Sequence, residues 1–271
     1  MQYKQLPDGT QIPVLGLGTW DIGGRDTPDR TRDDELTELL QRIIRMGYTH
    51  LDTAEYYGGT HTEELVGRAI QAFARDDVFI TTKVSPEHLG YADVHKSLDA
   101  SLRRLQTDYV DLYLIHWPSQ TIPLTETFPA LNEAVADGRV RRVGVSNFDV
   151  ALMEESMRLC QTPIATNQVR YNLLDRKPVQ NGVLDFCQRH NILLTAYSPL
   201  KGGVLSNSTV AAIAQKHGVP PGQVAIQWLI QQPGVITIPK STNVNHLQDN
   251  LDALKLGLDE EDLGLLDMID D

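Results

Sequence analysis

The sequence has few cysteines and no cysteine-rich motif. Among its 271 residues only Cys160 and Cys187 are cysteines. They lie far apart and form no C-x-x-C pair, which argues against a disulfide scaffold or a structural zinc site and fits a reducing compartment. We therefore interpret both as core residues and expect no bound metal.

Positive charge is also scarce. Lys and Arg total 24 against 36 Asp and Glu, so the formal net charge is −12. Such a chain has no global field that attracts phosphate backbones or anionic lipid, so we expect neither nucleic acid nor a membrane as a partner. No stretch approaches the roughly 20 apolar residues that span a bilayer, and the N-terminus lacks an apolar run of signal-peptide length. We expect a cytoplasmic enzyme or binding protein.

Apolar runs of strand length alternate with segments of helical period along the chain. No linker rich in Pro, Gly or Ser divides it, so we expect one domain over residues 1–271. Eight such units predict an α/β fold, a (β/α)8 TIM barrel. A doubly wound sheet also alternates, so the pattern alone leaves that fold open. The expected strands are 14–17, 48–52, 78–84, 109–116, 140–146, 164–168, 192–197 and 235–238.

The two ends of the chain show secondary-structure patterns outside the eight repeated units. Residues 3–14 form two strand-like pieces around Pro7-Asp8-Gly9, which predicts an N-terminal β-hairpin that plugs the bottom of the barrel. The acidic run 259–262 precedes several leucines. Because acidic residues in the first turn suit the helix dipole, we predict a short C-terminal helix there.

Polar residues close nearly every expected strand. The carboxyl ends of barrel strands converge on one face, where catalytic residues lie. Each residue taken alone also has an ordinary explanation as a helix cap, a rim residue or a solvated charge. Lys83 and His116, however, arise inside strongly apolar runs, where burying a charge is costly unless it is paired. The strand-end residues are Asp52, Lys83, His116, Ser146, Asn147, Asn167, Gln168, Tyr197 and Lys240.

Four motifs give the chain a resemblance to a known family. They are Gly16-Leu-Gly-Thr-Trp20, Leu51-Asp-Thr-Ala-Glu-Tyr-Tyr-Gly58, Ile115-His-Trp-Pro118 with Gly144-Val-Ser-Asn147, and Ile238-Pro-Lys-Ser241. In this order and spacing the chain resembles an aldo-keto reductase from end to end. The resemblance implies a catalytic tetrad of Asp52, Tyr57, Lys83 and His116. Tyr56 is adjacent, but the spacing selects Tyr57.

The chemistry of carbonyl reduction explains these residue types. Hydride must reach carbon and a proton must reach oxygen, so the protein supplies an acid and a polarised pocket. The pKa of tyrosine is ordinarily about 10, and we expect the cation of Lys83 to lower the pKa of Tyr57. Asp52 would hold Lys83, and His116 would orient the substrate oxygen. A plain buried ion pair of Asp52 and Lys83 is the alternative.

The cofactor site is implied by the same resemblance. Gly16-Leu-Gly18 lacks the third glycine and the acid of a Rossmann fingerprint, so the barrel itself would bind NADPH or NADP. Where many relatives have an arginine beside the 2′-phosphate, this chain has His246, which weakens the preference for NADPH and leaves NADH as a weaker alternative. The implied contacts are Gly18, Thr19, Trp20, Asp52, Ser146, Asn147, Gln168, Tyr197, Ser198, Leu200, Lys240, Ser241, Asn243, His246, Asp249 and Asn250.

The substrate is a small carbonyl compound whose identity the sequence leaves open. We expect an open pocket lined by Trp20, Tyr57, His116, Trp117 and Phe148. The short rim segments resemble family members that act on small aldehydes, dicarbonyls or keto-sugars, and the family implies a monomer. Two other functions remain open: a Schiff-base aldolase that uses Lys83, and a non-catalytic NADP(H)-binding sensor or regulatory subunit.

Overall fold

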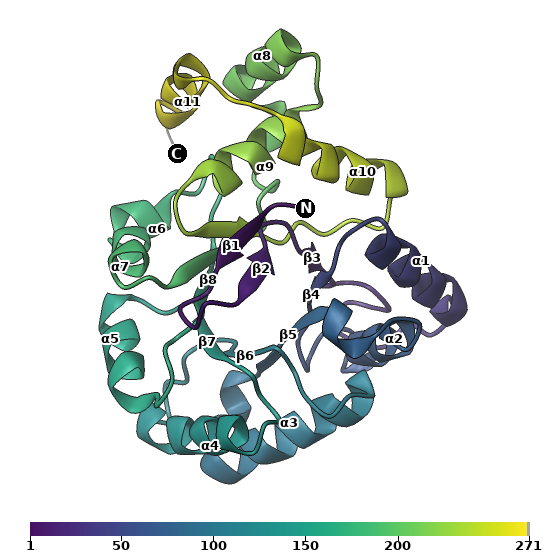
Figure 1. The fold of residues 1–271 in the computed structure, drawn as a ribbon, viewed down its shortest axis with the longest axis vertical. Coiled ribbons are helices and arrows are strands. Elements are labelled where there is room, and N and C mark those ends of the chain that lie inside the picture. Colours follow the sequence, from purple (N-terminus) through teal and green to yellow (C-terminus); the bar gives the residue numbers. More distant parts are fainter. Residues whose placement is uncertain (270–271) are drawn as a thin grey trace.

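Eight parallel strands form a barrel in the computed structural model, which describes residues 1–269 (Figure 1). Neighbouring strands pair in sequence order, and Leu15 pairs with Thr237 to close the ring between its first and last strands. The predicted (β/α)8 fold is confirmed, because a doubly wound sheet stays open. The strands are β3 (Leu17–Gly18), β4 (His50–Asp52), β5 (Phe79–Val84), β6 (Leu112–Ile115), β7 (Val143–Ser146), β8 (Thr166–Arg170), β9 (Leu193–Tyr197) and β10 (Val235–Thr237).

Helices surround the strands (Figure 1). They are α1 (Asp33–Arg45), α2 (His61–Ile70), α3 (Tyr91–Leu105), α4 (Leu124–Ala136), α5 (Val150–Leu159), α6 (Lys177–Gln180), α7 (Val183–Arg189), α8 (Ser208–His217), α9 (Pro221–Gln231) and α10 (Val244–Asp252), with short 3-10 turns at η1 (Arg75–Asp77), η2 (Pro86–His88), η3 (Val204–Ser206) and η4 (Ala253–Lys255). Helix α1 shows why they form: it buries Leu36, Leu40 and Ile43 on one face. Among the described residues no helix is long and apolar enough to cross a membrane.

Two strands are each followed by a pair of helices, which the periodicity did not separate. Gly182, at a φ of 79°, divides α6 from α7. Gly218, at a φ of 65°, ends α8, and Pro220 precedes α9. Both breaks therefore follow from residues that end or redirect a helix.

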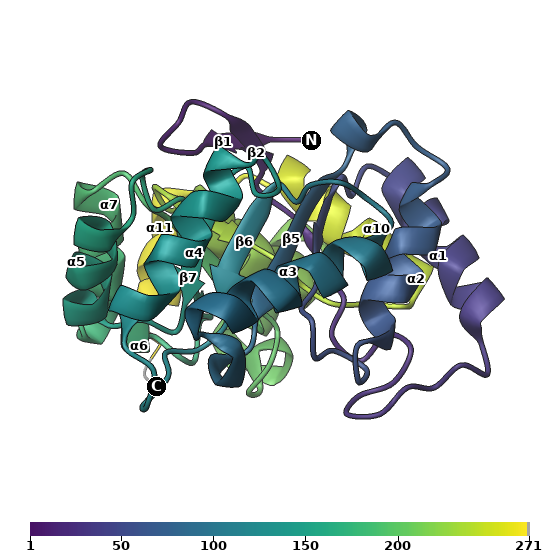
Figure 2. The same cartoon turned by 90° about the horizontal axis from the view of Figure 1, so that it is seen from below.

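The N-terminal hairpin lies across one end of the barrel (Figure 2). Strands β1 (Tyr3–Gln5) and β2 (Gln11–Pro13) pair antiparallel, as predicted. Lys4 ties the hairpin to the barrel because its Nζ donates to the carbonyl oxygens of Ile230 at 2.8 Å and Val235 at 2.6 Å.

The predicted C-terminal helix is α11 (Glu260–Asp267). Asp259 caps it, accepting from the backbone N–H of Asp262. The side chain of Asp262 in turn lies 2.6 Å from Nε2 of His217, which joins α11 to α8. The two helices lie side by side outside the ring (Figure 1).

Glycines in the first motif serve barrel closure. A Cβ added at Gly18 would lie 2.7 Å from the carbonyl oxygen of Ile238, and one at Gly16 would lie 2.6 Å from the His50 ring. The backbone N–H of Gly18 donates to the carbonyl oxygen of Pro239 at 3.2 Å. Glycine at position 18 therefore allows the close approach to the segment after the last strand, and glycine at position 16 leaves room for the His50 ring of β4.

His50 makes the fold sensitive to acid. Its ring is buried in β4, and burial lowers its pKa to about 4 from an ordinary 6.5. Between these values the unfolded chain binds a proton that the folded ring does not, so stability falls as the pH falls through this range. Between pH 7.5 and pH 5, we expect the free energy of unfolding of His50→Gln to fall by about 2 kcal/mol less than that of the parent. Urea unfolding at both pH values measures this, and equal losses would contradict it.

Candidate active site

A cavity of about 500 Å³ opens at the carboxyl ends of the strands. Residues from several successive strand ends line it, which is where barrel enzymes place their chemistry. Those predicted from the sequence are Gly18, Trp20, Asp52, Tyr57, His116, Trp117, Ser146, Asn147, Gln168, Tyr197, Ser198, Leu200 and Lys240. Those that the sequence analysis missed are Asp21, Tyr56, Pro199, Lys201, Ile238 and Pro239.

Lys83 is fully buried in β5 and is held by three oxygen atoms. Its Nζ donates to Asp52 Oδ1 at 2.7 Å, to the carbonyl oxygen of Thr53 at 2.7 Å and to the Tyr57 hydroxyl at 3.4 Å. An ammonium has three N–H donors, so these contacts use all of them. Burial lowers the pKa of Lys83, and the carboxylate of Asp52 opposes that effect.

Tyr57 reaches the cavity from the turn between β4 and α2. The expectation that Lys83 lowers its pKa is wrong here: burial raises the pKa of Tyr57 well above its ordinary value, and the nearby charge of Asp52 raises it further. The physical reason is that a buried phenolate loses its hydration, and the charge of Lys83, which is paired with Asp52, does not offset that cost. Tyr57 therefore holds its proton at neutral pH.

His116 follows β6 and presents a neutral imidazole. Burial, and then the charge of Lys83, lowers the pKa of His116 to about 2. The Tyr56 ring stacks on it with centroids 4.8 Å apart, and Tyr57 meets it edge-on at 5.7 Å. Its Nδ1 is buried without a hydrogen-bond partner among residues 1–269. A neutral ring can donate one hydrogen bond, which suits a carbonyl oxygen.

Polar side chains at or near the ends of β7, β8 and β9 form another part of the cavity wall. Gln168 Nε2 donates to Asp52 Oδ2 at 2.7 Å, and the Tyr197 hydroxyl donates to Asn147 Oδ1 at 3.0 Å. Asn147 has a φ of 62°, in the left-handed region, so the chain turns sharply at the cavity edge. Gln168 therefore both lines the wall and anchors the carboxylate that holds Lys83.

Two cations lie close to the Trp20 ring. Nζ of Lys201 is 4.6 Å from the ring centroid, and the guanidinium of Arg25 is 5.0 Å away. Lys201 belongs to the loop after β9, which therefore reaches the Trp20 side of the cavity. No sequence motif marks Lys201, because the contact joins two loops that are distant in sequence.

Several predicted residues do not line the cavity. Phe148 is buried in the core, where its carbonyl oxygen accepts from Asn167 Nδ2 at 2.9 Å. Thr19 is buried and donates to the carbonyl oxygen of Asp52. Lys83 lies behind the cavity wall, where it contacts the lining residues Asp52 and Tyr57. Five further residues lie on the segment that continues from the cavity edge through α10: Ser241, Asn243, His246, Asp249 and Asn250.

The N-terminal part of that segment is polar and open. Asn243 caps α10, accepting from the N–H of Asn245 at 2.9 Å, and His246 is exposed in its first turn. Lys240, whose Nζ is 4.0 Å from Asp21, lies where this segment meets the cavity. A cation followed along the chain by a helix N-terminus favours the binding of an anionic group.

Fold and site together define a barrel enzyme with an acid–base cluster at its mouth. The chain belongs to the aldo/keto reductase family, whose model matches residues 14–271. Methylglyoxal reductase YeaE of Escherichia coli is 38% identical over 98% of this chain and 95% of its own, and glyoxal reductase of Bacillus subtilis is 36% identical over 98% and 91%.

Solved structures of aldo-keto reductases are similar to this chain as well. A thermostable aldo-keto reductase, solved with the inhibitor epalrestat, has a TM-score of 0.96 and 52% identity, with 98% of this chain and 99% of that chain covered. An aldo-keto reductase from Klebsiella pneumoniae, solved with NADPH, has a TM-score of 0.87 and 38% identity, with 98% and 95% covered. Family membership therefore covers the whole barrel.

Proposed function

We propose that this chain is an NADPH-dependent reductase that converts small aldehydes and ketones to alcohols, with Tyr57 as the general acid. One observation carries the proposal: the protonated Tyr57 hydroxyl borders the cavity and contacts the Lys83 ammonium at 3.4 Å, with neutral His116 beside it. Names of relatives, methylglyoxal reductase and glyoxal reductase, support the same reaction.

The residues of the cavity fit a reduced nicotinamide dinucleotide, which supplies hydride when bound. Ser146, Asn147 and Gln168 offer hydroxyl and amide groups for the carboxamide, and the Tyr197 ring offers a stacking face. Lys240 and the N-terminus of α10 offer positive potential for phosphate. Relatives from Klebsiella pneumoniae solved with NADPH or NADP support this assignment.

Each tetrad residue then has one task. His116 donates a hydrogen bond to the substrate oxygen and fixes its position. Tyr57 gives its proton to that oxygen as negative charge develops there. Lys83 stabilises the phenolate that remains, and Asp52 keeps Lys83 charged and in place, consistent with their 2.7 Å contact.

The aldolase alternative is disfavoured by the surroundings of Lys83. A Schiff-base lysine needs a free amine that faces the substrate. Lys83 is instead fully buried with all of its protons engaged. A non-catalytic sensor would have the same fold, so only a measurement of turnover distinguishes it from the reductase.

The substrate class follows from the cavity walls. Trp20 and Trp117 provide aromatic surfaces, and about 500 Å³ must hold the nicotinamide as well as the substrate. Small dicarbonyls and keto-sugars therefore fit best. We propose a monomer in the cytoplasm, where its two free cysteines suit a reducing environment.

The test is NADPH oxidation with a panel of small aldehydes, dicarbonyls and keto-sugars, run beside NADH. Turnover supports the reductase and begins to rank substrates. Tight NADPH binding without turnover of any carbonyl would favour the sensor instead.

Cofactor preference yields a separate prediction. His246 is exposed in the first turn of α10, near the segment proposed to hold phosphate. We expect His246→Arg to raise the ratio of kcat/KM with NADPH to that with NADH by about tenfold, because a permanent charge near a 2′-phosphate adds a charge-assisted hydrogen bond. His246→Gln is the matched neutral control. An unchanged ratio in the arginine variant would show that position 246 does not face the phosphate.

A further inference from the structure

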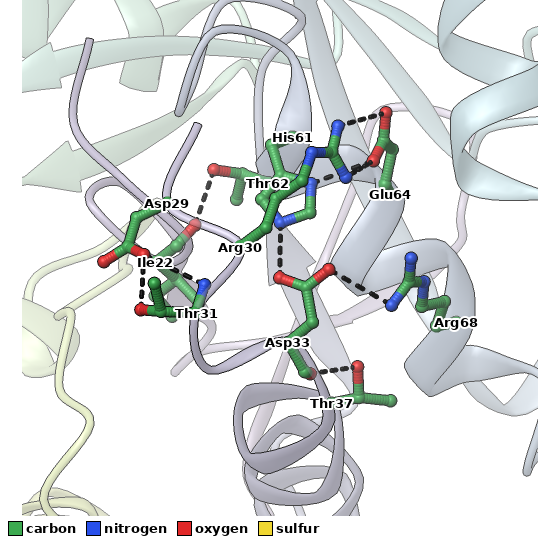
Figure 3. Close-up of polar contacts among 10 residues, drawn as sticks. All are labelled: Ile22, Asp29, Arg30, Thr31, Asp33, Thr37, His61, Thr62, Glu64 and Arg68. Atoms are coloured by element: carbon green, nitrogen blue, oxygen red, sulfur yellow. Dashed lines mark hydrogen bonds and ion pairs between the residues drawn. The ribbon is translucent and has the colours of Figure 1, made fainter. Parts of the chain in front are cut away.

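His61 is fully buried at the start of α2, and both of its ring nitrogens face carboxylates (Figure 3). Nε2 lies 2.7 Å from Asp33 Oδ1 at the start of α1, and Nδ1 lies 2.8 Å from Glu64 Oε2. The tetrad mechanism makes no use of these groups, and none of the three lines the cavity. A buried histidine between two carboxylates therefore needs another explanation.

Two arginines complete this cluster (Figure 3). Arg30 donates to both oxygens of Glu64, at 2.7 and 3.3 Å, and Arg68 donates to Asp33 Oδ2 at 3.2 Å. We call these five residues, Arg30, Asp33, His61, Glu64 and Arg68, the His61 clasp. It joins Arg30, before α1, and Asp33, the first residue of α1, to three residues of α2.

The clasp connects two parts of the active site. One is the Trp20 loop, residues 19–32, which carries a cavity wall and is further fastened where Thr62 Oγ1 donates to the carbonyl oxygen of Ile22 at 2.8 Å. The other is the turn that begins at Tyr57, because the N–H of Thr62 donates to the carbonyl oxygen of Tyr57 at 3.3 Å. Residues on α2 thus bind the loop and the turn at once.

We propose that His61 is a positioning residue that, through the clasp, holds the Trp20 loop against the turn carrying Tyr57 and so fixes the width of the substrate cavity. The kinetic part of this inference rests on the proposed function. A looser clasp weakens substrate binding more than it slows chemistry, because Lys83 and Asp52 hold the tetrad independently.

The ring of His61 lies among charged groups. They are Asp33 from α1, Glu64 and Arg68 from α2, and Asp29 and Arg30 from the Trp20 loop. Each carboxylate that contacts the ring is also paired with an arginine, so His61 links the two ion pairs to each other.

The experiment measures KM and kcat for methylglyoxal with saturating NADPH. His61→Gln should raise KM about tenfold while kcat changes little, the effect of losing one of the two hydrogen bonds between the ring and the carboxylates. Glu64→Gln should raise KM in the same direction, because it weakens the paired contact with Arg30. His217→Gln, which breaks a histidine–carboxylate pair remote from the cavity, is the matched control and should leave KM unchanged.

A second readout does not need activity. The Trp20 loop contains the exposed Arg25, so its release should speed tryptic cleavage there relative to other sites in His61→Gln and not in His217→Gln. Equal cleavage rates in the parent and His61→Gln, or an unchanged KM in His61→Gln, would overturn the positioning role. Absence of carbonyl turnover in the parent would count against the proposed function alone, because cleavage still reports on the clasp.

Discussion

Replacing Tyr57 by Phe should lower kcat/KM for carbonyl reduction by about 10²–10⁴-fold. The substitution removes one hydroxyl and keeps the ring that meets His116 edge-on at 5.7 Å. Because Tyr57 is buried and protonated, it is the group in the cavity best placed to give a proton to the substrate oxygen. Initial rates with NADPH and a small dicarbonyl measure the loss. Fluorescence titration with NADPH should show unchanged affinity.

Tyr56→Phe is the matched control. Tyr56 is adjacent, 42% exposed, and contacts His116 through its ring face, which phenylalanine retains. Loss of one hydroxyl at this position should therefore leave turnover near that of the parent. If Tyr57→Phe turned over normally, Tyr57 could not be the acid. If both variants failed equally, the effect would come from the aromatic cluster and not from a transferable proton.

Much of the architecture could be predicted from the sequence because it depends on local pattern. Pro7-Asp8-Gly9 between two strand-like pieces predicts the hairpin, and the alternating apolar runs predict eight β/α units, whose closure into a barrel is seen in the pairing of Leu15 with Thr237. Parallel strands then bring their carboxyl ends to one face, so Asp52 and His116 could be placed at the same cavity without knowledge of their contacts.

What could not be predicted depends on contacts between distant segments. Phe148 was expected in the pocket, yet the turn at Asn147, with its φ of 62°, is followed by a side chain that packs into the core. The pKa of Tyr57 depends on burial and on how fully Asp52 neutralises Lys83, and spacing determines neither. The contact of Lys201 with Trp20 likewise joins loops that no motif connects.

Lys83→Met should slow reduction and also destabilise the fold. It removes the ammonium proposed to stabilise the phenolate of Tyr57, so we expect kcat to fall by about 10²–10³-fold. It also leaves Asp52, only 2% exposed, without its cation. Breaking one side of a buried pair typically costs about 3–5 kcal/mol of unfolding free energy. Urea unfolding and initial-rate kinetics measure the two effects separately.

The double variant Asp52→Asn/Lys83→Met separates the structural role of the pair from its chemical role. With both charges gone, no uncompensated carboxylate is buried, and Gln168 Nε2, now 2.7 Å from Asp52 Oδ2, has an amide oxygen available as its acceptor. The double variant should therefore regain most of the unfolding free energy that Lys83→Met loses, while its kcat stays low. Recovery of activity together with stability would mean that the pair only supports the barrel. A double variant that stays inactive but is as stable as the parent assigns the charged pair to the chemistry, since the fold is then intact without it.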